Sequence, residues 1–145
     1  AHDLQIQRMA PPGVACFAAT QEDPLFGPVV SFRIGGMVPE LLQDYAFRIP
    51  PLTNEDARAL VQGPQASPLL LGGQEGDVVV GPPVDLAALE DLLIRLGQLA
   101  DHLPEVSRLE LNPIIAHPRG VAVLRATGSV ARPQIRTDLE ARRLL

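Results

Sequence analysis

The sequence contains no lysine: all 12 basic residues are arginine, and with 17 acidic residues the net charge is −5. A P-loop requires a lysine for its phosphates, and a Schiff-base enzyme requires a lysine amine, so both mechanisms are excluded for this chain. Aromatic residues make up only 3% of the sequence, and the arginines form no basic stripe. Because nucleic-acid binding relies on basic surface and aromatic stacking, we expect no nucleic acid partner.

Cysteine is almost absent as well. Cys16 is the single cysteine, which excludes an internal disulfide and a cysteine-rich zinc site. It lies in the apolar run 14–17, so we predict a buried structural thiol rather than a nucleophile. The three histidines, His2, His102 and His117, are scattered and have no metal-ligand spacing.

Long apolar runs are missing too. No segment approaches the roughly 20 apolar residues of a membrane span, and Ala1 begins no signal-peptide pattern, so we expect no membrane association and a cytoplasmic location. The chain of 145 residues is 46% hydrophobic and 20% charged, which is typical of a globular protein with one domain.

The most informative segment is Leu109-Glu110-Leu111-Asn112-Pro113. Its period of two predicts a strand with a leucine face and a polar face, so Glu110 and Asn112 would point the same way, roughly 6–7 Å apart. Both offer oxygen, the donor that Mg²⁺ prefers, and Pro113 marks a strand end or a bulge. The alternative is a surface strand that carries two polar residues.

A glycine pair, Gly35-Gly36, stands between a predicted strand at 29–34 and a predicted short helix at 37–43. Exposed N–H groups and the positive end of a helix dipole would favour an anion there. The alternative is an ordinary strand-to-helix turn that uses glycine for its freedom in φ.

The remaining patterns predict an α/β (α+β) fold, with a mostly antiparallel sheet of about five or six strands and helices packed on one face. The pattern predicts a hairpin at 14–34, a long irregular excursion at 63–83, and a tail at 128–145 that is a linker or a loosely docked helix. Further strands are predicted at 4–9, 45–49, 106–112 and 121–126, and helices at 53–62 and 85–103.

In this order the motifs resemble the ATP-grasp domain of ADP-forming acyl-CoA synthetases, which also occurs joined to GCN5-type acetyltransferase domains. The resemblance is carried by the segments Asp23–Val30, Gly35–Asp44, Phe47–Leu52 and Leu109–Pro113. It implies that residues 1–127 are a partial ATP-grasp domain, the nucleotide and metal lobe without its first lobe, and that 128–145 are a linker or tail.

The resemblance implies a domain that binds ATP and Mg²⁺ between two lobes. In the family, a phosphoryl group passes to and from a histidine on a companion domain, and acyl-CoA and ADP are formed. Carried onto this sequence, the cofactor-binding residues would be Gly35, Gly36 and Arg48, and the metal ligands would be Glu110 and Asn112. No catalytic residue is assigned.

Two positions depart from the family pattern, although Glu40 and Asp44 fall on positions that it usually keeps. Ala15 stands where the family has a glutamate, and Arg125 stands where it has a metal-binding aspartate. An arginine near a metal site reverses the local charge. We therefore hypothesise that Arg125 pairs with Glu110 and takes the space of the metal.

Three interpretations follow for function. The chain is part of a ligase that acts only with its first lobe and CoA-binding domains, or it is a degenerate lobe that regulates an acetyltransferase, or it is an interaction module with an accidental motif match. The open surface where the other lobe would lie could also pair with a second copy, which gives a homodimer.

Overall fold

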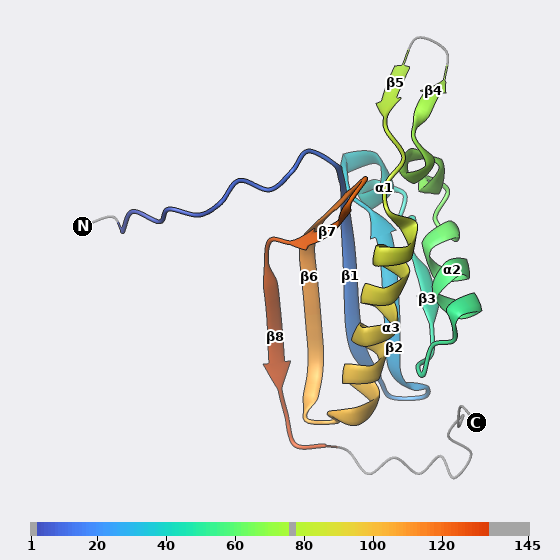
Figure 1. The fold of residues 1–145 in the computed structure, drawn as a ribbon. Coiled ribbons are helices and arrows are strands. Elements are labelled where there is room, and N and C mark those ends of the chain that lie inside the picture. Colours follow the sequence, from blue (N-terminus) through green and yellow to red (C-terminus); the bar gives the residue numbers. More distant parts are fainter. Residues whose placement is uncertain (1–2, 76–77, 134–145) are drawn as a thin grey trace.

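The computed structural model describes residues 3–75 and 78–133, which form one six-stranded sheet with helices on one side (Figure 1). The strand order is β3-β2-β1-β6-β7, and β8 pairs with the other half of β6. Every pairing in this sheet is antiparallel. The predicted fold class, a mostly antiparallel sheet with helices packed on one face, is confirmed. The strands are β1 (Val14–Asp23), β2 (Gly27–Ile34), β3 (Ala46–Arg48), β6 (Val106–His117), β7 (Gly120–Val123) and β8 (Ala126–Val130).

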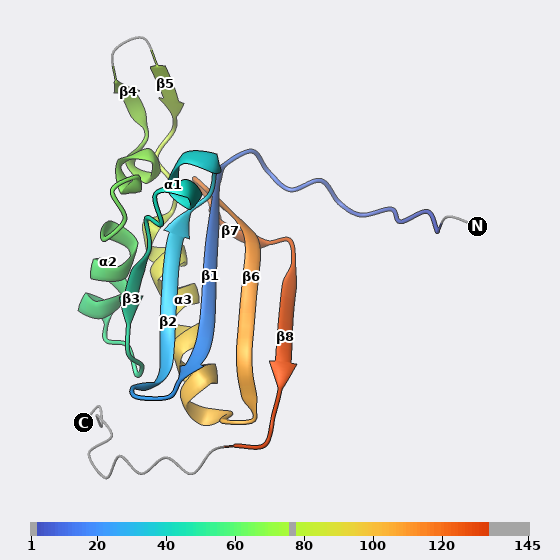
Figure 2. The same ribbon diagram turned by 180° about the vertical axis from the view of Figure 1, so that it is seen from behind.

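Two helices cover the same face of the sheet, α2 (Asn54–Gln62) and α3 (Leu86–His102) (Figures 1 and 2). A capping box starts α2, because the Thr53 side chain accepts from the Asp56 N–H while the Asp56 carboxylate accepts from the Thr53 N–H. Asp85 caps α3 by accepting from the Ala88 N–H at 3.0 Å. These are the helices predicted at 53–62 and 85–103.

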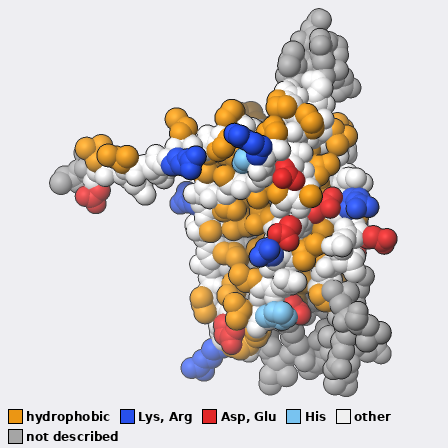
Figure 3. All heavy atoms as spheres, viewed as in Figure 1, with side chains coloured by type: hydrophobic (Ala, Val, Ile, Leu, Met, Phe, Trp, Pro, Cys, Tyr) orange, Lys and Arg blue, Asp and Glu red, His pale blue; other side chains and the backbone are white. Residues whose placement is uncertain are grey.

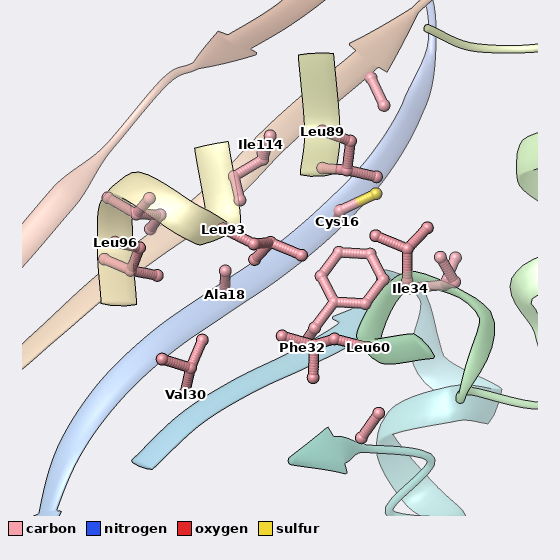
Figure 4. Packing of buried hydrophobic residues seen from close by; sticks show 14 of the residues in the cluster. Cys16, Ala18, Val30, Phe32, Ile34, Leu60, Leu89, Leu93, Leu96 and Ile114 are labelled. Carbon is pink, nitrogen blue, oxygen red and sulfur yellow. The ribbon is translucent and has the colours of Figure 1, made fainter. Parts of the chain in front are cut away.

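The core lies between α2, α3 and the covered face of the sheet (Figure 4). Alternate residues of β1 and β2 point into it, and the buried leucines of α3 pack against them. Leucine or phenylalanine side chains of this size each gain about 1.5–3 kcal/mol by leaving water. The labelled members are Cys16, Ala18, Val30, Phe32, Ile34, Leu60, Leu89, Leu93, Leu96 and Ile114.

Four predicted elements need correction. Residues 4–9 are not a strand: Leu4, Ile6 and Met9 are exposed, and the segment extends away from the sheet without a neighbouring strand (Figure 3). The excursion at 63–83 is not irregular throughout. It holds a 3₁₀ helix, η1 (Ser67–Leu71), and a hairpin formed by β4 (Gly73–Glu75) and β5 (Val78–Gly81).

The other two corrections concern the C-terminal strands. The strand predicted at 106–112 continues through a bulge to His117, and the strand predicted at 121–126 is two strands, β7 and β8. β8 runs to Val130, so the first residues after 127 pair with β6. The helix or linker predicted for the tail lies mostly outside the described residues. No helix in the described part of the chain is long and apolar enough to cross a membrane.

Cys16 yields a test of the core. Burial raises the pKa of its thiol from 9.0 to about 12, so the unfolded state releases this proton first as the pH rises. The thiol's contribution to stability is therefore complete below pH 9 and is lost between pH 9 and about 12. We expect urea denaturation to show a steeper fall in unfolding free energy between pH 8 and pH 10.5 for the wild type than for Cys16→Ala. Parallel curves would contradict the buried thiol.

Candidate functional site

The face of the sheet opposite α2 and α3 is not covered by these helices (Figure 2). One row of cross-strand neighbours runs over it from edge to edge, in the order Phe47, Ser31, Ala19, Glu110 and Thr127. The same strand alternation that buries Ala18 and Val30 in the core places this row on the uncovered face.

A groove of about 500 Å³ lies on the β3 side of this row. Arg48 is half-buried at its rim, and its Nη1 donates to the Phe47 carbonyl at 2.7 Å. The groove combines an apolar floor with a few polar groups and two opposite charges, Arg48 and Asp23, and a mostly apolar lining with few polar groups is usual for a small-molecule site. Its lining residues are Ala19, Gln21, Asp23, Phe26, Val29, Ser31, Phe47, Arg48 and Ile49.

Glu110 lies next to Ala19 on the uncovered face and forms an ion pair with Arg108. The hypothesis that Arg125 is its partner is therefore wrong. Arg108 and Glu110 are two residues apart on one strand and share a face. Arg125 lies between β7 and β8, and its carbonyl accepts from the Asn112 N–H at 3.0 Å. The two-residue spacing of Arg108 and Glu110 in the sequence is the feature from which this ion pair could have been predicted.

Asn112 occupies the bulge that Pro113 predicted. Cys16 aligns with Ile114 and Ala18 with Leu111, so the single residue Phe17 lies opposite both Asn112 and Pro113. Phe17 belongs to the uncovered face, and Asn112 is exposed beside it. Strand β6 thus carries both Glu110 and Asn112, and their role as metal ligands that point the same way stays a prediction.

The glycine pair has two steric functions at the end of β2. The Gly35 N–H donates to the Ala15 carbonyl at 2.7 Å, and a Cβ at Gly35 would lie 2.8 Å from that oxygen. Gly36 has φ +118°, a backbone conformation that L side chains rarely adopt. The following helix, α1 (Met37–Leu41), has only five residues. These contacts account for both glycines as a turn, and their role toward an anion stays a prediction.

Asp44 and Arg33 are fixed by contacts that the sequence did not suggest. Both carboxylate oxygens of Asp44 accept backbone N–H groups, from Gln65 at 2.7 Å and Ala66 at 3.0 Å, so this residue ties the end of α1 to the loop after α2. Arg33 is buried on the uncovered face. Its guanidinium carbon lies 4.8 Å from the Phe17 ring centroid and 5.5 Å from that of Tyr45. Polar residues alternating along β2 were the only signal for Arg33.

The donor set on β6 fits a magnesium ion that arrives with phosphates. Mg²⁺ usually takes one or two protein carboxylates and fills its other positions with water and substrate oxygens. Glu110 supplies a carboxylate, and Asn112 supplies an amide oxygen. Among the described residues there is no cluster of three histidine, cysteine or acidic side chains that would form a metal cage of its own.

An antiparallel sheet with one open face and these motifs in order is the architecture of an ATP-grasp lobe. The model of the ATP-grasp domain family matches residues 1–129, and the chain belongs to this family. It is 39% identical over 112 residues to acetate–CoA ligase [ADP-forming] I subunit beta of Pyrococcus furiosus. The aligned residues make up 77% of this chain and 46% of that protein.

Two further relatives support the same class. Trans-feruloyl-CoA synthase FCS1 from an unknown prokaryotic organism is 33% identical over 133 residues, with 88% of this chain and 18% of that protein covered. The second is the acetyl-coenzyme A synthetase 1 of Ca. Korarchaeum cryptofilum, solved with coenzyme A and Mg-AMPPCP. It superposes with a TM-score of 0.76 and 38% identity, over 84% of this chain and 55% of that one. The chain thus spans about half the length of the Pyrococcus and Korarchaeum relatives.

Asp44 provides a test of the loop anchor. Asp44→Ala leaves two backbone N–H groups without their acceptor, and we expect it to lower the unfolding free energy by roughly 1–3 kcal/mol. Asp44→Asn keeps one acceptor oxygen and should lower the unfolding free energy by a smaller amount. As a matched control, Asp91→Ala removes an exposed carboxylate that pairs with Arg95, and this should cost about 0.5 kcal/mol or less. Urea denaturation followed by circular dichroism measures all three. Equal losses for Asp44→Ala and Asp91→Ala would contradict the anchor.

Proposed function

We propose that this chain is the part of an ADP-forming acyl-CoA synthetase that binds Mg-ATP for phosphoryl transfer. The observation that carries the proposal is the uncovered sheet face, where a groove with Arg48 at its rim lies beside Glu110 in a chain of the ATP-grasp family. The Korarchaeum relative was solved with a magnesium nucleotide and coenzyme A, and the Pyrococcus relative is an ADP-forming ligase subunit, which supports the same class of reaction.

In this proposal each part of the face has a task. Arg48 serves the nucleotide, because its guanidinium neutralises phosphate charge. Gly35 and Gly36 lie at the far end of β2, five residues beyond Val30, the register partner of Arg48. The Gly35 N–H already donates to the Ala15 carbonyl, so the Gly36 N–H is the one proposed to face an anion. Glu110 and Asn112 hold Mg²⁺ by their oxygen atoms. The metal, when bound, neutralises charge on the phosphates, which is the main requirement of phosphoryl transfer.

The reaction needs partners that complete the site. These are the first lobe of the ATP-grasp domain, which would cover the uncovered face, and the CoA-binding domains, one of which carries the histidine that receives the phosphoryl group. A second copy on the same face is a further candidate partner. The relatives act on acetate and on ferulate, so the proposal names no particular acyl group as the substrate. We also propose a cytoplasmic location.

A second function is favoured by the charges around β6. Ala15 replaces a carboxylate, Arg125 replaces another, and Arg108 already pairs with Glu110. These features support a lobe that has lost ligase activity and that regulates or scaffolds a protein acetyltransferase. The two proposals differ in one property: the ligase lobe binds Mg-ATP productively, and the regulatory lobe need not do so.

Arg48 gives a test of the nucleotide site. In the complete protein that carries this domain, Arg48→Ala should weaken Mg-ATP binding by roughly 10- to 100-fold, the usual effect of losing a charge-assisted hydrogen bond. The matched control is Arg58→Ala on the exposed side of α2, where the arginine pairs with Glu90 at 3.9 Å. Calorimetric titration measures both affinities. An affinity of Arg48→Ala equal to that of Arg58→Ala would remove the groove from the proposed site.

A further inference from the structure

The ion pair between Arg108 and Glu110 lies at the proposed metal ligand itself. Their side chains line a small polar hollow of about 230 Å³ together with Thr127, Gly128 and Ser129. The Glu110 side chain is only 28% exposed, whereas that of Arg108 is 52% exposed. The carboxylate is therefore the more fixed partner, and the guanidinium is the one with room to move.

The direct cross-strand neighbours of the pair are uncharged. In register, Glu110 lies between Ala19 and Thr127, and Arg108 lies opposite Gln21 and Ser129. None of these direct neighbours carries a charge, and Arg108 and Glu110 are each other's ion-pair partner. The next acidic residue on this face of β1 is Asp23, whose carboxylate accepts from the Leu25 and Phe26 N–H groups. A cation that binds the Glu110 carboxylate must therefore compete with Arg108.

We propose that Arg108 is a positioning residue that competes with the metal for Glu110 and thereby couples metal binding to nucleotide binding. The inference rests on the proposed function. A guanidinium stays charged at any pH that proteins tolerate, so only an exchange of partners releases Glu110 from it.

The exchange has different outcomes for free metal and for metal with nucleotide. When a free divalent ion takes the carboxylate, Arg108 loses its counter-charge and repels the ion. When the ion arrives with nucleotide phosphates, the released guanidinium finds a new anion, and arginine matches phosphate geometry well. Arg108 thus weakens the binding of free metal and strengthens the binding of the metal nucleotide.

Opposite effects of one substitution test this role. In the complete protein that carries this domain, Arg108→Gln should bind free Mn²⁺ roughly fivefold more tightly than the wild type, measured by water proton relaxation. The same variant should bind Mg-AMPPCP roughly fivefold more weakly, measured by calorimetry. Arg95→Gln, which removes an exposed arginine paired with Asp91 on α3, should leave both affinities unchanged.

Glu110→Gln separates this inference from the proposed function. It should lower Mn²⁺ affinity in the wild-type background and abolish the gain caused by Arg108→Gln. If Glu110→Gln weakens Mn²⁺ binding but Arg108→Gln changes both affinities in the same direction, or neither, the coupling role of Arg108 is overturned and the metal site stands. If Glu110→Gln leaves Mn²⁺ affinity unchanged, Glu110 is not a metal ligand, and both the inference and the proposed metal site are overturned.

Discussion

The two-residue period of β1 and β2 is the constraint on which the rest of the structure depends. It directs one set of side chains, such as Ala18 and Phe32, into the core beneath α3, where they are fully buried. The other set, such as Ala19 and Ser31, must then lie on the opposite face, where it forms the groove. A slip of one residue in the register would exchange the two faces and expose the core. Because the register is held by core burial, the positions of the groove residues are held by it as well.

The residues proposed to bind the metal and the nucleotide lie on strands that differ in their position in the sheet. Glu110 is positioned by β6, whose neighbouring leucine, Leu111, is buried in the core. Arg48 stands at the rim of the groove on β3, a strand of three residues at the sheet edge. Ligand groups on the central strand are thus more rigidly placed than those on the edge strand. Under the proposed function, the metal site would be held fixed by β6, and the nucleotide contact on β3 would adjust when a partner domain covers the face.

The elements with strong local signals could be predicted from the sequence, and those decided by distant partners could not. The capping residues Thr53 and Asp85 and the leucines of α3 located both helices, and the turn residues between 21 and 28 located the β1–β2 hairpin, because each signal is local. The segment 4–9 has the alternation of a strand, but no neighbouring strand pairs with it, so alternation alone gave the wrong result. Glu110 pairs with Arg108 and not with Arg125, because strand alternation places residues 108 and 110 of β6 on one face, whereas Arg125 lies beyond β7. The contacts of Asp44 join residues more than 20 positions apart and left no local trace.

The measurement that tests the account most directly is a calorimetric titration of Mg-ATP into the complete protein that carries this domain, together with its Arg125→Asp variant. The account predicts saturable binding of one nucleotide by the wild type, with Arg125→Asp binding at least as tightly because it adds a carboxylate beside β6. No binding by the wild type, with binding gained in Arg125→Asp, would contradict the account. That result would identify a lobe whose nucleotide site has been silenced by charge reversal and retained for regulation.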